Sequence, residues 1–433
     1  MQTNFPEGWK LTTLGDISRV RRGASPRPID SPEWFADEGP GWVRITDVTK
    51  SKGRLRSTEQ YLSPSGALRS VPVKPGQLIM SICATIGEPA IVEIDVCIHD
   101  GFVVFDQYDK NLDTQFLYYF LRYWMPQFRA IGQTGTQANL NTNIVNATPI
   151  ILPPIQEQQL IAEILNALDE TIAHTTSIIA KLKQIKAGLL HDLLTRGLDE
   201  NGELRDAIAH PEQFKDSPLG LIPKDWEIFK LSEVVPRAEY GISVSLEDEV
   251  GIPVLRMNNL KNGEVDLTDL KKSGSTQAEK LLLQNFDVLF NRTNSIEHVG
   301  RTGIWRGQIS QASFASYLVR LVPDTSKLIH EYLNIWLNLP STQLLIRRYA
   351  TPGVHQVNIN PTNLRKILIA LPDTISEQKQ IVEKVSVIDS RIGEEEAYLE
   401  KLKLQKKGLM HDLLTGKVRV NQVKNNLAIP VTA

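Results

Sequence analysis

Two long stretches of the chain place apolar side chains at alternating intervals of four and three residues. The first series runs from Ile161 to Leu193 and the second from Ile381 to Leu413, and eight of the ten positions are apolar in each. This spacing is typical of the seam of a coiled coil. It predicts two long helices, and we expect them to pair with each other in an antiparallel arrangement.

The two stretches are copies of each other, 220 residues apart. "GLLHDLLT" (188–195) recurs as "GLMHDLLT" (408–415). Polar residues in a seam help to set register and partner, and here they interrupt both seams at the same two places. Prolines mark the helix starts and glycines the ends, as helix capping favours. The interrupting pairs are Thr175 with Lys186 and Glu395 with Lys406, the prolines are Pro153, Pro154 and Pro372, and the glycines are Gly197 and Gly416.

The segments before each helix mix strand-like and helix-like runs in the same order. Runs rich in β-branched residues and bounded by glycine, proline or charged residues predict strands. An amphipathic run at 114–131 predicts a helix interrupted by Pro126, and a second helical run spans about 329–348. The predicted strands lie within 42–48, 77–82, 90–98, 102–105, 254–260, 287–292 and 316–322.

These patterns predict an α+β protein with two tandem mixed domains joined by two antiparallel coiled-coil helices about a pseudo-two-fold axis. The expected parts are a first domain (1–150), a first helix (151–197), an acidic linker (198–217), a second domain (218–370), a second helix (371–416) and a C-terminal tail (417–433). A coiled coil between separate chains is the alternative to pairing within one chain.

Composition narrows the class of protein. A net charge of −2 provides no overall basic field for nucleic acid. No apolar run reaches the roughly 18 residues that a membrane span needs, and the start has no signal-peptide pattern. The two cysteines, Cys83 and Cys97, form no CxxC motif and have only His99 nearby at metal-ligand spacing, which favours reduced thiols over a zinc site or a disulfide. We therefore expect a cytoplasmic protein without a metal site.

Motifs for catalysis are missing from the sequence. There is no "NPPY" or "DPPY" methyltransferase motif, no glycine-rich loop for S-adenosylmethionine and no GxxxxGK[ST] phosphate loop. "PDTISEQK" (372–379) is too compact for a nuclease site and falls on a predicted helix. The His191-Asp192 and His411-Asp412 pairs have no nucleophile at a readable spacing, so we interpret them as structural or partner-binding. No catalytic residue is predicted.

The repeated motifs resemble those of the specificity subunits of type I restriction-modification systems, and the resemblance covers essentially the whole chain. It is carried by Trp9 and Trp226 at the domain starts, by "LPPIQEQQLIAEI" (152–164) and "LPDTISEQKQIVEKV" (371–385) at the helix starts, and by "LLHDLLTRG" and "LMHDLLTGK" at the helix ends. The second copy departs from the first in having Pro372-Asp373 where the first has two prolines.

The resemblance implies a non-catalytic subunit that recognises a bipartite, asymmetric site in double-stranded DNA. It implies two adenine-N6 methyltransferase subunits and two translocating nuclease subunits as partners. These partners, rather than this chain, would use S-adenosylmethionine, ATP and Mg.

Basic clusters and an amide-rich segment are the candidate DNA contacts, because phosphates are bound by Arg and Lys and base edges by Arg, Asn and Gln. We seek base readers where the two halves differ. The duplicated Asn139/Asn141 and Asn358/Asn360 are therefore interpreted as turn formers. The candidates are Arg19, Arg21, Arg22, Arg27, Lys50, Lys52, Arg54, Arg56, Lys271, Lys272 and the loop residues Asn291, Arg292 and Asn294.

The repeated helices provide the candidates for helix pairing and methyltransferase docking. Glu157-Gln158 and Glu377-Gln378 are either first-turn caps or part of a docking surface, and the sequence leaves both open. The candidates are Glu157, Gln158, Ile161, Leu165, Leu168, Leu182, Glu377, Gln378, Ile381, Val385, Ile388 and Leu402. A tandem coiled-coil interaction scaffold that does not read DNA is the alternative function, and a self-sufficient methyltransferase is disfavoured by the missing motifs.

Overall fold

The computed structural model describes residues 6–132, 139–246, 248–353 and 356–420. The chain divides into two compact units, one of Met1–Ser177 with Ala397–Ala433 (unit 1) and one of Ile178–Glu396 (unit 2). Parts of the predicted tail (421–433) and of the two polar loops (133–138, 354–355) lie outside the described residues. Among the described residues, no helix combines the length and the apolar character needed to cross a membrane.

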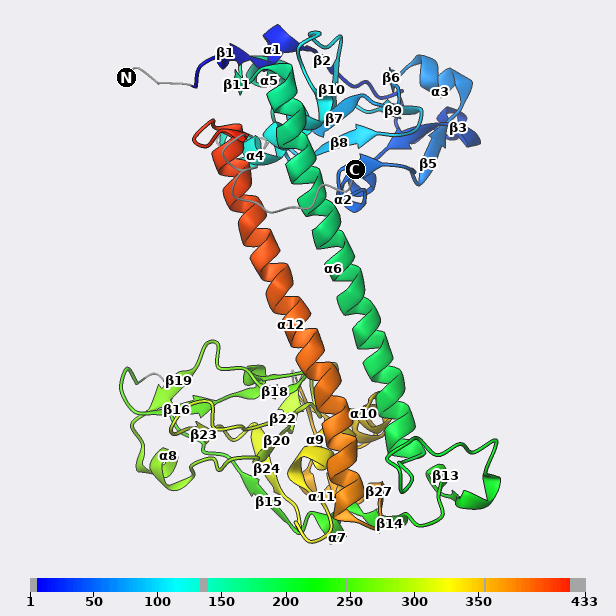
Figure 1. Cartoon of the computed structure of the whole chain (residues 1–433), viewed down its shortest axis with the longest axis vertical. Coiled ribbons are helices and arrows are strands. Elements are labelled where there is room, and N and C mark those ends of the chain that lie inside the picture. Colours follow the sequence, from blue (N-terminus) through cyan, green and yellow to red (C-terminus); the bar gives the residue numbers. More distant parts are fainter. Residues whose placement is uncertain (1–5, 133–138, 247, 354–355, 421–433) are drawn as a thin grey trace. The chain divides into compact units, whose positions relative to one another are not determined.

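Unit 1 is built on a five-stranded sheet in the order β2-β10-β7-β8-β4, whose central strands lie side by side in Figure 1. A four-stranded sheet, β5-β3-β9-β6, and a β1-β11 pair complete it. Strands β7, β8, β9 and β10 are buried along their whole length, as expected from continuous apolar runs. The bounds are β1 Lys10–Thr13, β2 Arg19–Arg22, β3 Phe35–Val43, β4 Arg54–Leu55, β5 Gln60–Leu62, β6 Val71–Val73, β7 Leu78–Ser81, β8 Pro89–Val92, β9 Val96–Ile98, β10 Phe102–Asp106 and β11 Pro149–Leu152.

The helices of unit 1 correct two predictions. The predicted strand 42–48 ends at Val43, because the Asp47 carboxylate accepts the Arg44 backbone N–H at 2.8 Å and caps α2. Helix α4 continues through Pro126, which is exposed, so water can reach the backbone groups that proline leaves unpaired. The helices before the first long helix are α1 Leu14–Ile17, α2 Ile45–Lys50, α3 Pro64–Leu68, α4 Thr114–Gly132 and α5 Thr142–Asn146.

Unit 2 contains a six-stranded sheet, β15-β24-β20-β22-β18-β17, with smaller sheets β19-β16-β23, β21-β26-β25, β14-β27 and β12-β13. The bounds are β12 Phe214–Ser217, β13 Gly220–Pro223, β14 Glu227–Lys230, β15 Arg237–Tyr240, β16 Ile252–Leu255, β17 Leu260–Lys261, β18 Gly263–Val265, β19 Lys271–Ser273, β20 Val288–Asn291, β21 Thr293–Asn294, β22 Thr302–Ile304, β23 Ser313–Phe314, β24 Leu318–Val322, β25 Thr351–Pro352, β26 Val357–Asn358 and β27 Leu368–Leu371.

The helical run expected at 329–348 is two helices rather than one. Leu339 has an extended backbone (φ −62°, ψ 134°) because it precedes Pro340, and a residue before proline is disfavoured in the helical region. The short helices of unit 2 are α7 Leu231–Val234, α8 Thr276–Lys280, α9 His330–Asn338, α10 Pro340–Arg347 and α11 Pro361–Leu364.

The central sheets of the two units share one topology. The order β2-β10-β7-β8-β4 corresponds to β15-β24-β20-β22-β18, and the last pair of each is parallel. The pairing of Arg22 with Val103 corresponds to that of Tyr240 with Val319. Two tandem mixed domains are therefore confirmed, and the register identifies equivalent positions even where the residues differ.

The two long helices lie within the predicted segments 151–197 and 371–416, but each begins four residues after the predicted start because strands β11 and β27 extend into those segments. Helix α6 spans Ile155–Thr195 and α12 spans Ile375–Leu414. Gly197 and Gly416 follow with φ of +64° and +72°, a left-handed conformation that glycine adopts without strain. Every position of both predicted seams is buried or half-buried. The start of α6 and the end of α12 enter the core of unit 1, while the end of α6 and the start of α12 enter that of unit 2.

Candidate functional site

A buried carboxylate at the start of α6 binds a tryptophan and an arginine. Trp9 donates its indole N–H to Glu157 Oε2 at 3.1 Å. Arg419, which follows α12, donates Nε to Oε1 at 2.8 Å and Nη2 to Oε2 at 2.9 Å. This bidentate contact connects the segment after α12 to the start of α6, and we call it the Glu157 anchor.

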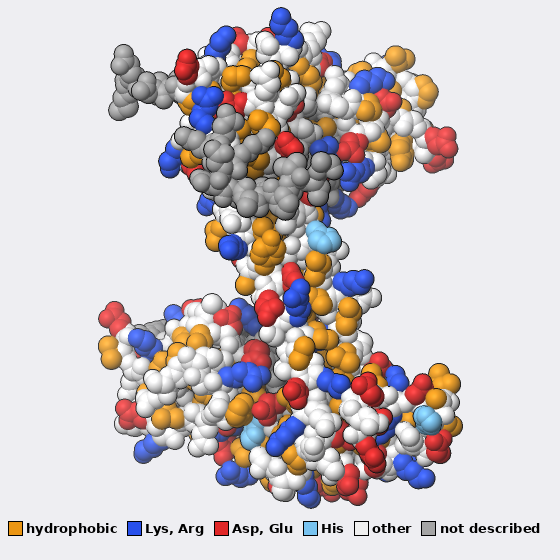
Figure 2. All heavy atoms as spheres, viewed as in Figure 1, with side chains coloured by type: hydrophobic (Ala, Val, Ile, Leu, Met, Phe, Trp, Pro, Cys, Tyr) orange, Lys and Arg blue, Asp and Glu red, His pale blue; other side chains and the backbone are white. Residues whose placement is uncertain are grey.

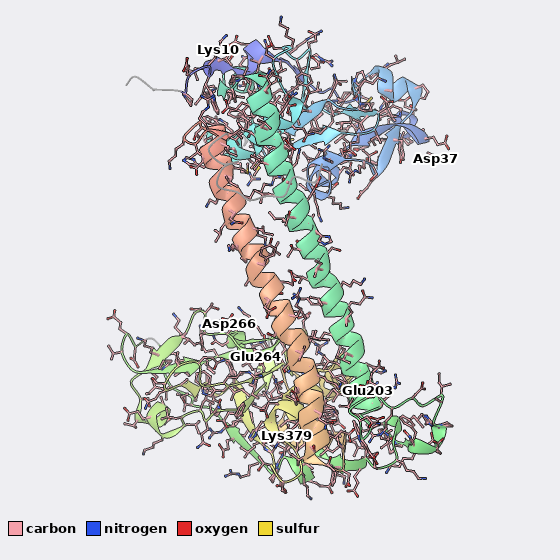
Figure 3. All side chains as sticks on the ribbon, in the orientation of Figure 1. Lys10, Asp37, Glu203, Glu264, Asp266 and Lys379 are labelled. Atoms are coloured by element: carbon pink, nitrogen blue, oxygen red, sulfur yellow. The ribbon has the colours of Figure 1, made fainter. Side chains whose placement is uncertain are left out.

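The same arrangement recurs at the start of α12. Trp226 donates its indole N–H to Glu377 Oε1 at 3.2 Å, and Arg205 donates Nη1 to the same oxygen at 2.8 Å. Leu198 adds its backbone N–H at 2.8 Å. Arg205 follows α6 in the segment that also carries Glu203 (Figure 3). We call this contact the Glu377 anchor. In both anchors, the glutamate at the start of one long helix binds an arginine from the segment that follows the other long helix.

The glutamine beside each anchor tethers a domain helix. Gln158 Oε1 accepts the Asp113 backbone N–H at 2.9 Å, just before α4, and its Nε2 donates to the Asn111 and Pro153 carbonyls at 2.8 Å. Gln378 Oε1 accepts the Ile329 backbone N–H at 3.0 Å, at the start of α9, and its Nε2 donates to the Lys327 carbonyl at 2.7 Å. Both glutamines are fully buried.

The sequence leaves these four side chains as either first-turn caps or a docking surface, and their burial favours the structural role. As whole residues, the two glutamates are 9% exposed and the two glutamines 0%. Side chains so deeply enclosed offer no surface to a partner, so they anchor the helices inside each unit. The sequence did not identify Arg205 and Arg419, because they follow their helices at different distances and a search at constant offset misses them.

Reciprocal ion pairs join the two helices in each unit. In unit 2, Lys186 of α6 pairs with Asp389 of α12. In unit 1, Asp169 of α6 pairs with Lys406 of α12, and these positions are the copies of the first pair, 220 residues apart. Tyr119 donates its hydroxyl to Asp169 Oδ2 at 2.9 Å, and burial, with the nearby Asp169 carboxylate, raises the pKa of Tyr119. The two lysines of the seams thus each have a specific partner on the other long helix.

Of the predicted apolar pairing residues, Ile161 and Leu165 belong to the core of unit 1, and Ile381 and Val385 to that of unit 2. Ile161, Leu165, Ile381, Val385 and Leu402 are buried. Leu168, Leu182 and Ile388 are half-buried. Their assignment to helix pairing fits this burial, whereas docking of a methyltransferase stays a prediction.

Several predicted DNA contacts already form ion pairs with carboxylates, and Glu93 pairs with two of them. Arg21 pairs with Asp106 at 2.5 Å, and Lys50 pairs with Glu59 at 2.6 Å. The remaining pairs are Arg27 with Asp100 at 3.3 Å, Arg54 with Glu93 at 3.2 Å and Arg56 with Glu93 at 2.7 Å. A phosphate would have to compete with these acids. On the visible face of unit 2, basic and acidic side chains are likewise interspersed (Figure 2).

Other candidates have no such acid. Counting only residues that the structure describes, no carboxylate oxygen lies within 4.0 Å of a charged nitrogen of the six remaining basic candidates. Lys272 donates to the Glu249 backbone carbonyl at 3.2 Å. These cations form no ion pair of this kind among the described residues, so they can bind a phosphate or a base edge. They are Arg19, Arg22, Lys52, Lys271, Lys272 and Arg292.

The predicted loop 291–294 is not a loop. Asn291 ends β20, is fully buried and donates Nδ2 to the His298 carbonyl at 3.3 Å, while Asn294 belongs to β21 and accepts the Ser295 backbone N–H. Asn291 therefore has no exposed surface with which to contact a base. The run of polar residues suggested a loop because short strands between polar residues carry little apolar signal.

The duplicated asparagines take local roles. Asn141 accepts the Ile144 backbone N–H at 2.9 Å and caps α5, and Asn360 accepts the Thr362 backbone N–H at 2.9 Å and caps α11. Asn139 bridges to Cys83, and Asn358 pairs with Thr293. Their interpretation as local structure formers agrees with these contacts.

Comparison with known proteins gives one consistent result. A family model described as "Type I restriction modification DNA specificity domain" matches residues 6–184 and again 223–404. The type I restriction enzyme MjaVIII specificity subunit of Methanocaldococcus jannaschii is 24% identical over 438 residues, covering 96% of this chain and 95% of the relative. A second protein of that archaeon is 30% identical over 208 residues, and this chain spans about half (49%) of its length.

A solved structure supports the same fold. A chain in the structure described as "Structural basis underlying complex assembly and conformational transition of the type I R-M system" superimposes with a TM-score of 0.60. The match has 19% sequence identity and covers 96% of this chain and 99% of that chain.

Proposed function

The chain belongs to the specificity-subunit family of type I restriction-modification systems, and we propose that it recognises a bipartite, asymmetric site in duplex DNA without catalysing a reaction itself. One observation carries this proposal. Two domains whose central sheets share one strand order have different residues at equivalent positions, while the anchors and the reciprocal ion pairs are kept twice. Two similar frames with different side chains suit two unrelated half-sites.

We further propose that the chain assembles in the cytoplasm with two adenine-N6 methyltransferase subunits and two nuclease-translocase subunits. The partners would use S-adenosylmethionine, ATP and Mg. Most of the basic candidates of unit 1 are paired with acids, and the net charge is −2. Because affinity for DNA comes largely from phosphate neutralisation, the partners would supply much of the phosphate contact.

The two long helices are proposed to form an antiparallel coiled coil that sets the distance between half-sites and carries the methyltransferases. Seams that are buried or half-buried at every position and reciprocal ion pairs in each unit support pairing. Insertion of four residues after Thr175, with a matching insertion after Glu395, would lengthen each helix by about 6 Å. We expect a longer unread gap in the methylated motif, and an unchanged gap would refute the spacer role.

The decisive experiment is methylation mapping. The chain would be co-expressed with its methyltransferase subunit, and N6-methyladenine would be mapped across the host genome. An asymmetric motif of two short half-sites with an unread gap is the expected result. The control is the methyltransferase expressed alone, which should leave that motif unmethylated.

A scaffold that does not read DNA is the second candidate, and the extensive pairing of basic residues with acids favours it. It predicts that the complex binds duplexes of any sequence equally. Binding of one bipartite duplex in preference to scrambled duplexes of the same length would exclude it.

A further inference from the structure

One end of the central sheet carries a matching group of residues in each unit. In unit 1, the end of β2, the segment after β7 and the segment before β10 meet Asn139. In unit 2, the end of β15, the segment after β20 and the segment before β24 meet Asn358. The bridge between Cys83 and Asn139 matches the pairing of Thr293 with Asn358. We call this place the sheet-end group.

The frame of the sheet-end group is kept in both units. Gly23 and Gly241 follow β2 and β15, and each donates its backbone N–H to the first residue of the neighbouring strand, at 2.9 Å and 3.2 Å. A Cβ at Gly23 would lie 2.1 Å from the His99 carbonyl oxygen, and one at Gly241 would lie 2.3 Å from that of Ala315. The backbones therefore approach equally closely in both units, and the equivalence of positions around them is secure.

The side chains on this common frame differ. Ladder pairing makes Arg22 equivalent to Tyr240, since each is paired with the second residue of the neighbouring strand. It also aligns Ser81 with Asn291, which makes Ile82 equivalent to Arg292. Each unit thus has one arginine in the group, but Arg22 ends β2 whereas Arg292 lies in the segment after β20. Residues that read different half-sites should differ in this way.

Arg292 is oriented but not neutralised. Its guanidinium lies over the Tyr240 ring, with Cζ 5.1 Å from the ring centroid. Nη2 donates to Asn358 Oδ1 at 3.2 Å and Nη1 to the Ser316 carbonyl at 3.5 Å, while the buried Nε has no acceptor. The Tyr240 ring and the two neutral oxygen acceptors fix the plane of the guanidinium, and none of them carries a negative charge that would balance it.

Arg22 is oriented by a backbone group instead. It donates Nε to the Asp100 carbonyl at 2.8 Å, and its side chain is exposed. The Asp100 carboxylate is engaged elsewhere, accepting from Ser25 at 2.7 Å and from Arg27 at 3.3 Å. The terminal nitrogens of Arg22 are therefore available to a ligand with two acceptors.

We propose that Arg22 and Arg292 are the specificity-determining arginines of the two half-sites, each reading one guanine. A guanidinium presents two parallel N–H donors, and guanine presents O6 and N7 as paired acceptors in the major groove. The Tyr240 ring fixes the plane of the Arg292 guanidinium, and the hydrogen bond to the Asp100 carbonyl orients that of Arg22. This assignment rests on the proposed function, because it presumes that the units read DNA.

The test compares Arg292→Gln and Arg22→Gln with the wild-type chain, each in complex with the methyltransferase. The methylated motif is mapped for every complex. Arg292→Gln should make one guanine position degenerate in one half-site, and Arg22→Gln should do so in the other. Discrimination at that position should fall by about 5- to 150-fold, the equivalent of the 1–3 kcal/mol of a bidentate contact.

Two controls separate reading from charge and folding. Arg237→Gln removes the same charge from β15 at the position equivalent to Arg19, where both units have arginine, and should leave the motif unchanged. Replacing the identified guanine by 7-deazaguanine removes only N7 from the DNA. It should weaken binding of the wild-type complex and have little further effect on the matching variant.

The outcomes distinguish this assignment from the function on which it rests. A wild-type complex without a bipartite motif would overturn the proposed function and this assignment with it. A wild-type bipartite motif that persists in both variants, or that degrades equally in both half-sites, would overturn the assignment alone. Full 7-deazaguanine sensitivity retained by Arg292→Gln would overturn it for that arginine.

Discussion

Replacement of Glu377 by glutamine tests whether the buried anchor holds α12 in unit 2. The change keeps the size of the side chain but removes the charge that Arg205, Trp226 and Leu198 share on one oxygen. The side chains of Glu377 and Arg205 are 11% and 10% exposed. The substitution therefore leaves a nearly enclosed guanidinium without its main partner.

The expected cost follows from this geometry. Removing one member of a buried ion pair typically costs about 3–5 kcal/mol, because the remaining charge stays desolvated. Arg205 keeps a second partner, Asp225, at 2.7 Å. We therefore expect a loss at the lower end, about 3 kcal/mol in the free energy of unfolding of unit 2.

Hydrogen exchange of the full chain measures this loss locally, which avoids assuming two-state unfolding of a two-unit protein. Peptides that cover 196–226 and the first turns of α12 should lose protection in Glu377→Gln. The matched control is Glu383→Gln, the same change at an exposed position of α12, which should alter stability by less than about 0.5 kcal/mol. Equal protection of these peptides in the two variants would refute the anchor's role.

Two further predictions concern the helix pair and the pH response. Lys186→Asp should destabilise unit 2, and adding Asp389→Lys should restore much of the loss. The coupling energy should reach up to about 1 kcal/mol, because the pair is partly exposed. A double-mutant cycle measured by urea unfolding gives this coupling energy, and a value of zero would contradict a specific pair. Burial lowers the pKa of His99, whose Nδ1 accepts the Gly101 backbone N–H at 2.9 Å. Folding therefore favours the neutral form of His99. Its contribution to the free energy of unfolding is fully present above the unfolded pKa of about 6.5 and is lost as pH falls through the lower folded pKa. Exchange of the 98–102 segment should rise on acidification, beyond the intrinsic rate change, and His99→Asn, which retains an acceptor, should flatten that rise.

The long helices could be predicted from the sequence because every local signal agrees there. Periodicity, the prolines at the starts and the glycines at the ends each point to the same boundaries, and duplication doubles the signal. The short elements were less predictable. Asp47 caps a helix inside an apparent strand, and Pro340 divides an apparent helix, since single contacts decide such short elements.

The candidate site was predictable only as a set of residue types. Sequence identifies Arg22 and Arg292 as basic. Only the strand register reveals that each lies in the sheet-end group of its own unit. It also cannot show that Asp106 neutralises Arg21 or that Gln158 is enclosed, because these partners are distant along the chain. Long-range pairing of side chains carries no local pattern.

The exchange of closing arginines between the repeats bears on how the gene arose. Arg419, at the end of the second repeat, binds Glu157 of the first repeat. Arg205, at the end of the first repeat, binds Glu377 of the second. A lone ancestral repeat with this design would have lacked a closing arginine unless a second copy provided one. A half-length chain of this design would need a second copy to complete its anchor, and joining two copies in one chain would supply that second copy permanently.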